Sequence, residues 1–93
     1  MTELLKEKKL TAQDFKIGLK AARLYEKVFK GRNLIDDMMS STNLWEIVAI
    51  SAKHVKSVAD YEEFVDSDEY DDLSDRVGDI VNKLYDDLQP KKD

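Results

Sequence analysis

Residues 43–56, with the sequence NLWEIVAISAKHVK, decide the fold. Apolar residues lie almost all round the helix that this stretch predicts, with a thin polar strip of Glu46 and Lys53. Asn43 followed three residues later by Glu46 has the form of a capped helix start. A helix that is apolar on most sides is normally central and covered by its neighbours. We therefore expect residues 44–56 to form the buried helix of a small domain.

Helices with one apolar face are predicted before and after this central helix. Upstream, residues 19–30 place apolar side chains on one broad face and basic side chains on the other, and residues 33–39 form a short helix. Downstream, a short helix over 60–66 precedes a longer one over 71–88, in which apolar residues recur at spacings of three and four. The predicted fold class is all-α, a small bundle of about four to five helices.

The entry to the first long helix leaves two alternatives open. Residues 15–20 alternate apolar and polar side chains, which is the period of a strand, yet a helical period follows from Leu19. The preceding Thr11 and Asp14 have the spacing of a capping box. We expect either a short extended segment or extra helical turns here, and Gly31 in a left-handed conformation after the helix.

A length of 93 residues allows one domain. We expect a flexible N-terminal arm over 1–10, a single helical domain over 11–88 and a disordered C-terminal tail over 89–93, since Pro90 cannot continue a helix. The side chains predicted to be buried in one cluster lie on the apolar sides of the helices: Leu24, Phe29, Trp45, Val48, Val77, Ile80 and Leu84.

Charge is divided unevenly along the chain. The net charge is −5, but the first 33 residues carry nine basic and four acidic side chains, whereas the other 60 carry six and sixteen. The acidic part would repel phosphates and no base-reading motif is present, so we expect no nucleic-acid partner. No apolar run is long enough for a membrane span or a secretory signal, which predicts a soluble cytoplasmic protein with no membrane partner.

The residue types that carry chemistry are sparse or wrongly spaced. The chain has no cysteine and a single histidine, His54, which excludes thiolate zinc sites and multi-histidine metal sites. The acidic run 66–72 departs from the calcium-loop pattern at the glycine and ligand positions. Ser51 lies near His54 without an oxyanion loop, and the acids around Glu62 suit a solvated face better than an acid–base pair. We predict no enzyme, no cofactor and no metal site.

The residue types alone do not assign a function, and Met38, Met39 and Trp45 are more often core residues than part of a partner groove. The methionines and the tryptophan suit either the core or a partner groove, because methionine adapts its shape readily and recurs on surfaces that bind other proteins. The predicted partner-binding residues are Met38, Met39, Trp45, Tyr61, Phe64 and Tyr70.

Two segments of the chain carry a family resemblance. Residues 15–38 read FKIGLKAARLYEKVFKGRNLIDDM, an extended apolar stretch that leads into a helix closed by Gly31. Residues 42–66 read TNLWEIVAISAKHVKSVADYEEFVD, a buried helix, a short link and a helix start of the form Tyr-Glu-Glu-Phe, and an acidic final helix follows. Over residues 12–88 the chain resembles the tail assembly chaperones of long-tailed bacteriophages of Gram-positive hosts.

The resemblance implies a protein without catalytic residues, acting in the bacterial host cytoplasm. Such proteins bind the long tape measure protein, keep its apolar helices in solution and help recruit tail-tube subunits. The resemblance leaves the oligomeric state open, with a homo-oligomer as one alternative. Family members commonly occur in a short form and a longer form made by ribosomal frameshifting, and Pro-Lys-Lys at residues 90–92 can be encoded by a slippery run.

A second function class stays open beside this one. Residues 60–79 carry ten acidic side chains and one basic side chain, Arg76. An acidic stripe of this kind suits an immunity or inhibitor protein that neutralises a basic toxin or a DNA-binding enzyme. The salt dependence of binding separates the two classes, because contacts between many charges weaken steeply as salt rises.

Overall fold

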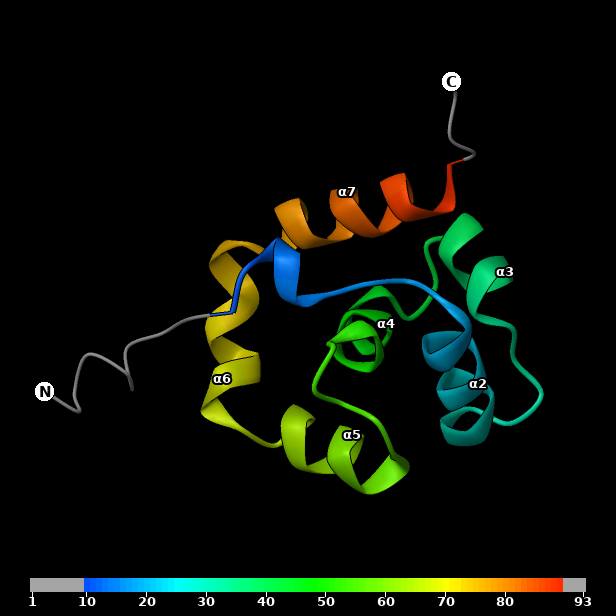
Figure 1. Ribbon diagram of the computed structural model, residues 1–93, viewed down its shortest axis with the longest axis horizontal. Helices are drawn as coiled ribbons and strands as arrows, with labels where there is room; N and C mark the ends of the chain where they lie inside the picture. The colour runs from blue at the N-terminus through cyan, green and yellow to red at the C-terminus, as the bar shows by residue number, and fades with distance from the viewer. Residues whose placement is uncertain (1–9, 90–93) are drawn as a thin grey trace, which may run out of the picture.

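Helix α4 (Leu44–Ser51) lies at the centre of the fold, as Figure 1 shows. The computed structural model describes residues 10–89. The last five residues of α4 are fully buried, and the helices that contact α4 are α2 (Leu19–Val28), α3 (Leu34–Met39), α5 (Val58–Val65) and α7 (Val77–Leu88). The prediction that this stretch of sequence forms the covered central helix is confirmed.

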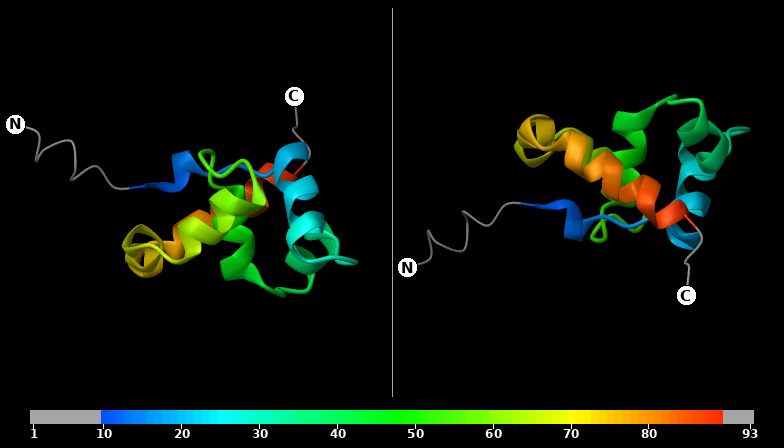
Figure 2. Two further views of the ribbon diagram at one scale, coloured as in Figure 1. Left: turned by 90° about the horizontal axis from the view of Figure 1, so that it is seen from below. Right: turned by 90° about the horizontal axis from the view of Figure 1, so that it is seen from above.

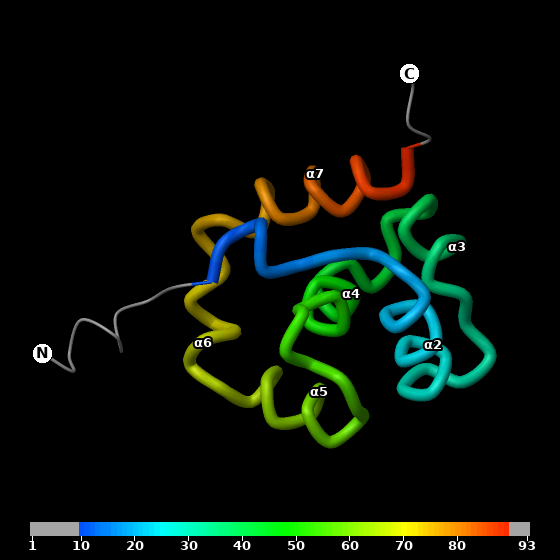
Figure 3. Tube along the Cα trace, in the orientation of Figure 1, coloured from blue at the N-terminus to red at the C-terminus, as the bar shows by residue number. Residues whose placement is uncertain are grey.

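The described part of the chain is all-α, which confirms the predicted fold class. Besides the five helices above it contains the short α6 (Asp68–Asp71) and two 3-10 turns, η1 (Ala12–Asp14) and η2 (Asp72–Asp75), and Figure 3 traces the path through them. None of the helices within residues 10–89 is long and apolar enough to cross a membrane. The arm predicted over 1–10 and the tail predicted over 89–93 lie almost wholly outside the described residues.

The segment that precedes α2 is extended, which decides between the two alternatives left open by the sequence. Thr11 and Asp14 form the predicted capping box around η1. Phe15 then pairs with Ala52 in an isolated antiparallel bridge, and the Lys16 N–H donates to the Ser51 carbonyl at 2.9 Å. In Figure 1 this segment runs between α7 and α4 before it turns into α2. Its strand-like period therefore reflects real pairing with the end of α4.

Two lysine side chains fasten this entry segment and α2 to the rest of the bundle. The Lys20 ammonium donates to the carbonyl oxygens of Ile50, Ala52 and Val55 at 3.0, 3.0 and 2.7 Å. The Lys83 ammonium on α7 donates to the Phe15 carbonyl at 2.6 Å. The last carbonyls of a helix have no partner within it, and a cation placed there satisfies them. Lys20 thus caps the C-terminal end of α4 from a neighbouring helix.

The core is one cluster of side chains drawn from every α-helix except α6. Of the seven residues predicted to be buried, four are buried and two are partly buried against the cluster. The prediction for Trp45 is wrong, since its side chain is 37% exposed. Trp45 occupies the first turn of α4, where that helix reaches the surface, whereas the buried residues of α4 begin at Ile47.

Three predicted helix boundaries are wrong, and each has a local cause. The central helix ends at Ser51 rather than 56, because Ala52 takes an extended conformation to pair with Phe15. The next helix begins at Val58, capped by the Ser57 hydroxyl. The last helix begins at Val77 rather than 71, because the acidic residues before it form α6 and η2 instead.

Two turn residues show how far local motifs predict geometry. Gly31 has φ +84°, as predicted for a left-handed position, although α2 already ends at Val28. Asn43 precedes α4 as predicted, but its φ of 56° places it in the left-handed region and its side chain makes no cap. The Asn43 amide instead donates to the Tyr25 hydroxyl at 3.1 Å. A tertiary hydrogen bond has displaced the predicted local one.

Candidate functional site

Large apolar side chains are exposed on α3 and at the start of α4. Ile35 is 39% exposed, Met39 73% and Trp45 37%. Ile35 and Met39 are four residues apart, which places them on one face of α3. We call these three residues, together with Tyr70 that packs on Trp45, the α3–α4 surface. Both views in Figure 2 show the beginning of α4 at one side of the molecule, between α3 and α6.

Trp45 is held in place by aromatic contacts and a hydrogen bond from α6. Its ring meets that of Tyr70 edge to face, with centroids 5.2 Å apart, and the Tyr70 hydroxyl donates to the Trp45 carbonyl at 2.7 Å. Tyr70 in turn contacts Phe64, 5.3 Å away, in the core. Burial, and to a smaller degree the charge of Glu46, raise the pKa of the Tyr70 hydroxyl well above its ordinary value. Tyr70 is therefore a neutral donor that fixes the exposed tryptophan.

The structure divides the six predicted partner-binding residues into two groups. Met38, Tyr61 and Phe64 are buried in the core cluster, and the Met38 carbonyl also accepts a hydrogen bond from Tyr85. Met39, Trp45 and Tyr70 belong to the α3–α4 surface. Of the buried three, Phe64 packs on the ring of Tyr70. Partner binding by the exposed three stays a prediction.

Two exposed apolar residues were not among the residues predicted to bind a partner. Ile35 belongs to the α3–α4 surface, and Leu19 on α2 is 66% exposed. For Ile35 a signal exists, because its spacing of four from Met39 puts both side chains on one helix face. For Leu19 no such signal exists, since exposure at the first position of α2 depends on where the extended entry segment ends.

A polar network centred on the buried Asp37 joins α2, α3 and the residue before α4. Asp37 is 6% exposed. One of its oxygens accepts from the Tyr25 hydroxyl and from Arg32 Nε at 2.7 Å, and the other accepts from Arg32 Nη2 at 2.9 Å. Asn43 completes the network through Tyr25. Both oxygens of this carboxylate are therefore committed to groups of the fold.

The charges of this network are perturbed in the directions that its geometry dictates. The Arg32 guanidinium first, and the Tyr25 hydroxyl second, lower the pKa of the Asp37 carboxyl. Burial first, and the hydrogen bond to Asp37 second, raise the pKa of Tyr25. The network thus consists of a carboxylate, a cation and a neutral phenol. It holds the loop before α3 and the loop before α4 in fixed positions.

Of the residues weighed for catalysis or metal binding, His54 and Glu63 line one hollow, and Ser51 is not among its lining residues. The Ser51 hydroxyl is buried and donates to the Val48 carbonyl at 2.9 Å. His54 lies on the following loop, with its ring 4.8 Å from that of Phe64. The acids around Glu62 lie on the exposed side of α5. Within the part of the chain that the structure describes, no group of three or more histidine, aspartate or glutamate side chains is arranged to hold a metal ion.

No protein-family model, curated protein or solved structure significantly matches this chain. The function therefore has to be inferred from the chemistry of the exposed residues themselves.

Proposed function

We propose that this protein is a tail assembly chaperone that binds helical segments of a phage tape measure protein and helps recruit tail-tube subunits. Exposed apolar residues on a firmly held corner of a small helical domain suit such a role. A chaperone of this kind has to cover the apolar face of a long helix until assembly proceeds, and an apolar surface of its own meets that need.

The observation that carries the proposal is the α3–α4 surface. Ile35 and Met39 lie on one face of α3. Trp45 lies in the first turn of α4, a helix that contacts α3, and its ring is fixed by Tyr70 of α6. The apolar face of a partner helix repeats at spacings of three and four, so it can lie against a row of this kind. A fixed tryptophan supplies a rigid anchor, and an exposed methionine adapts to varied partner side chains.

Calorimetry at two salt concentrations tests the proposal. The chain is titrated with a helical segment of the tape measure protein from the same genome. Apolar contacts are expected to dominate, so affinity should change by less than about threefold between low and high salt. A loss of affinity that grows steeply with salt, or no binding at either concentration, would contradict the proposal.

A second candidate function rests on the acidic segment, residues 66–76, which comprises α6 and η2 with their flanks. Most of its carboxylates are exposed, and an acidic inhibitor of a basic toxin needs such a surface. Arg76 forms ion pairs with Asp72 and Asp75, each at 3.3 Å, and so offsets part of that charge. Tight, strongly salt-sensitive binding to a basic toxin or a DNA-binding enzyme would favour this candidate over the chaperone.

The nucleotide sequence offers an independent test. Helix α7 ends at Leu88, so a longer frameshifted form can add a segment after it without interrupting a helix. We expect a slippery run near codons 89–92 and an open overlapping frame beyond it. A closed alternative frame would remove this support for the chaperone. The proposed site of action, the bacterial host cytoplasm, follows from the same function.

A further inference from the structure

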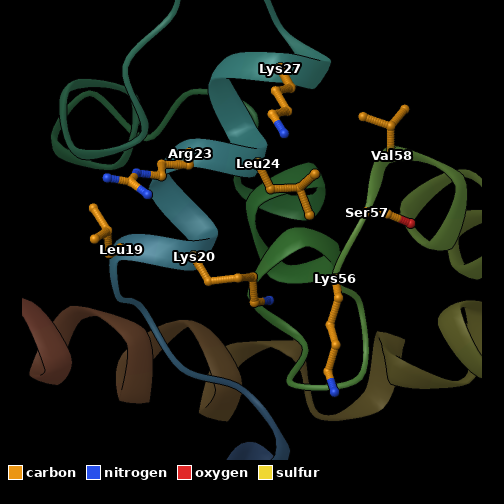
Figure 4. Close-up of a pocket in the computed structure, with 8 residues that line it drawn as sticks. All are labelled: Leu19, Lys20, Arg23, Leu24, Lys27, Lys56, Ser57 and Val58. Atoms are coloured by element: carbon orange, nitrogen blue, oxygen red, sulfur yellow. The ribbon is translucent and has the colours of Figure 1, made fainter.

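A hollow with a basic lining lies between α2 and the start of α5 (Figure 4). None of its lining residues belongs to the α3–α4 surface. Its volume is about 460 Å³. Four of its lining residues are basic, namely Lys20, Arg23, Lys27 and Lys56, and none is acidic. We call it the basic groove. The positive charge of the groove contrasts with the net charge of −5 of the whole chain.

The cations of the groove are held in two different ways. The Lys20 ammonium is fixed on three carbonyls at the end of α4, and burial first, and the charge of Lys56 second, lower its pKa. Arg23, Lys27 and Lys56 are exposed, and none of them forms an ion pair with any residue between 10 and 89. Three exposed cations without an ion-pair partner among residues 10–89 therefore surround a fixed one, and the nearby Asp60 carboxylate accepts from the Lys56 backbone N–H at 3.0 Å.

The floor of the groove consists of the partly buried Val58 and the edge of Leu24, a core residue that is 4% exposed. Figure 4 shows Leu24 pointing from α2 across the hollow toward Val58 at the start of α5. Lys20, Arg23 and Lys27 follow one face of α2 at spacings of three and four, so their attachment points extend over roughly 10 Å of helix. A line of separated cations above an apolar floor suits an extended set of carboxylates with an apolar side chain among them. It does not suit one compact anion, which needs donors that converge on a point.

We propose that the basic groove is a docking site for an acidic amphipathic segment of a partner protein. Glutamate or aspartate side chains of that segment pair with Arg23, Lys27 and Lys56, and one of its apolar side chains packs on Leu24 and Val58. The site is independent of the α3–α4 surface, so the two surfaces can engage two partners or two parts of one partner.

Charge elsewhere on the molecule favours a short acidic segment over a nucleic acid. A nucleic acid repeats its phosphates along its whole length, and beyond the groove it would meet α5, whose exposed side carries Glu62 and Glu63. An acidic protein segment can end its row of charges within the groove. Its apolar side chain also uses the floor, for which a phosphate backbone has no matching group.

The test uses a synthetic peptide of roughly twelve residues, about three helical turns, with glutamates along one face and a single leucine among them. Amide chemical shifts of the full chain are followed during titration at low salt. We expect shifts confined to residues 19–27 and 56–58. The same peptide with glutamine in place of glutamate should bind roughly tenfold or more weakly. Shifts centred on α3 or on the acidic segment would overturn the proposal.

Charge-reversal variants complete the test. The double change Arg23→Glu with Lys27→Glu should weaken peptide binding by roughly tenfold or more, whereas Lys30→Glu, an equal change per residue outside the groove, should alter it by less than about twofold. Should the double reversal unfold the chain, Arg23→Gln with Lys27→Gln replaces it and should weaken binding several-fold. Equal weakening by Lys30→Glu, or tighter binding of a DNA oligonucleotide of matched charge, would overturn the proposal. Because the α3–α4 surface is unchanged in these variants, their result does not depend on the tape measure proposal.

Discussion

Two regions of the molecule use their polar side chains differently. One is the unit of α2, α3 and α4, and the other is the acidic segment, residues 66–76. In the first, Arg32 binds both oxygens of the buried Asp37 at 2.7 and 2.9 Å. In the second, Arg76 reaches Asp72 and Asp75 at 3.3 Å, and its buried Nη1 has no hydrogen-bond partner among residues 10–89. Tyr25 extends the first arrangement to Asp37 and Asn43, which are 12 and 18 residues away from it in sequence. The two ion-pair partners of Arg76 are its near neighbours in sequence. Both proposed docking surfaces include residues of the firmly tied unit.

The largest effect should come from the core of the α2–α4 unit. Ile47→Ala removes a fully buried side chain of α4 and should lower the free energy of unfolding by about 2–5 kcal/mol. The same change at Ile35, which is 39% exposed, should cost less than about 1 kcal/mol. Urea titration measures both variants. Equal losses would mean that α3 is packed more closely than the structure shows.

Removing the charge of Asp37 should lower the stability of the fold more than removing the charge of any carboxylate in the acidic segment. Asp37→Asn removes the charge that Arg32 binds and should shift the urea midpoint clearly downward, because the guanidinium loses its charged partner. Asp75→Asn, in the acidic segment, should change stability by less than about 0.5 kcal/mol. If the two variants unfold at the same urea concentration, the contrast between the regions fails.

Acidic pH should lower the stability of the fold partly by protonating Asp37. The pKa of Asp37 is lower in the folded chain than its ordinary value, because Arg32 and Tyr25 stabilise the charged form. Its contribution to stability is therefore present above the unfolded-state pKa and is lost as pH falls through the folded-state pKa. Wild type should thus lose more stability on acidification than Asp37→Asn, as urea titrations at neutral and acidic pH would show. Parallel losses in both proteins would contradict this assignment.

Alkali should act through three tyrosines whose hydroxyls are neutral in the fold. Burial is the main cause that raises the pKa of Tyr25, Tyr61 and Tyr70. Their contribution to stability is present below the unfolded-state pKa of about 10 and is lost as pH rises through the higher folded-state values. The absorbance of tyrosinate should therefore rise together with loss of helical circular dichroism. Ionisation of these three hydroxyls in a fully folded chain would contradict the prediction.

The smallest effect concerns Gly78, in the first turn of α7. Among residues 10–89, a Cβ at this position would meet no other atom within 4 Å beyond its own helix backbone and chain neighbours. Gly78→Ala should therefore stabilise the chain by about 0.5–1 kcal/mol, through helix propensity alone. Thermal unfolding measures the gain. A destabilised variant would show that the start of α7 is more crowded than described.

The parts of the fold that were predicted correctly depend on periodicity. The apolar residues of α4 and the stripe of α7 determine burial directly, so Val48, Ile80 and Leu84 were placed in the core from the sequence. The starts of α2 and α4 and the end of α7 were predicted correctly. The end of α4 and the start of α7 were not, because they depend on contacts or local structure that periodicity does not show. The pairing of Phe15 with Ala52 ends α4 early, and no local pattern announces it.

The candidate sites could also be predicted only in part from the sequence. Met39 and Trp45 were named from residue type, but residue type does not distinguish Met38 in the core from Met39 at the surface. That difference of one position is a rotation of about 100° around α3, which depends on how α3 packs. The basic groove was visible only as scattered lysines and an arginine in the basic first third of the chain. Its concave shape arises where α2 meets residues 56–58, which are distant in sequence.

The most direct test of the account asks which region binds the tape measure protein. The double change Ile35→Ser with Met39→Ser alters the α3–α4 surface, and Glu69→Gln alters the acidic segment. Each variant is titrated with the tape measure segment in a calorimeter, after circular dichroism has shown that it is folded. We predict that the double variant loses roughly tenfold or more in affinity and that Glu69→Gln binds like the wild type. Unchanged binding by the double variant, with weakened binding by Glu69→Gln, would contradict the central claim.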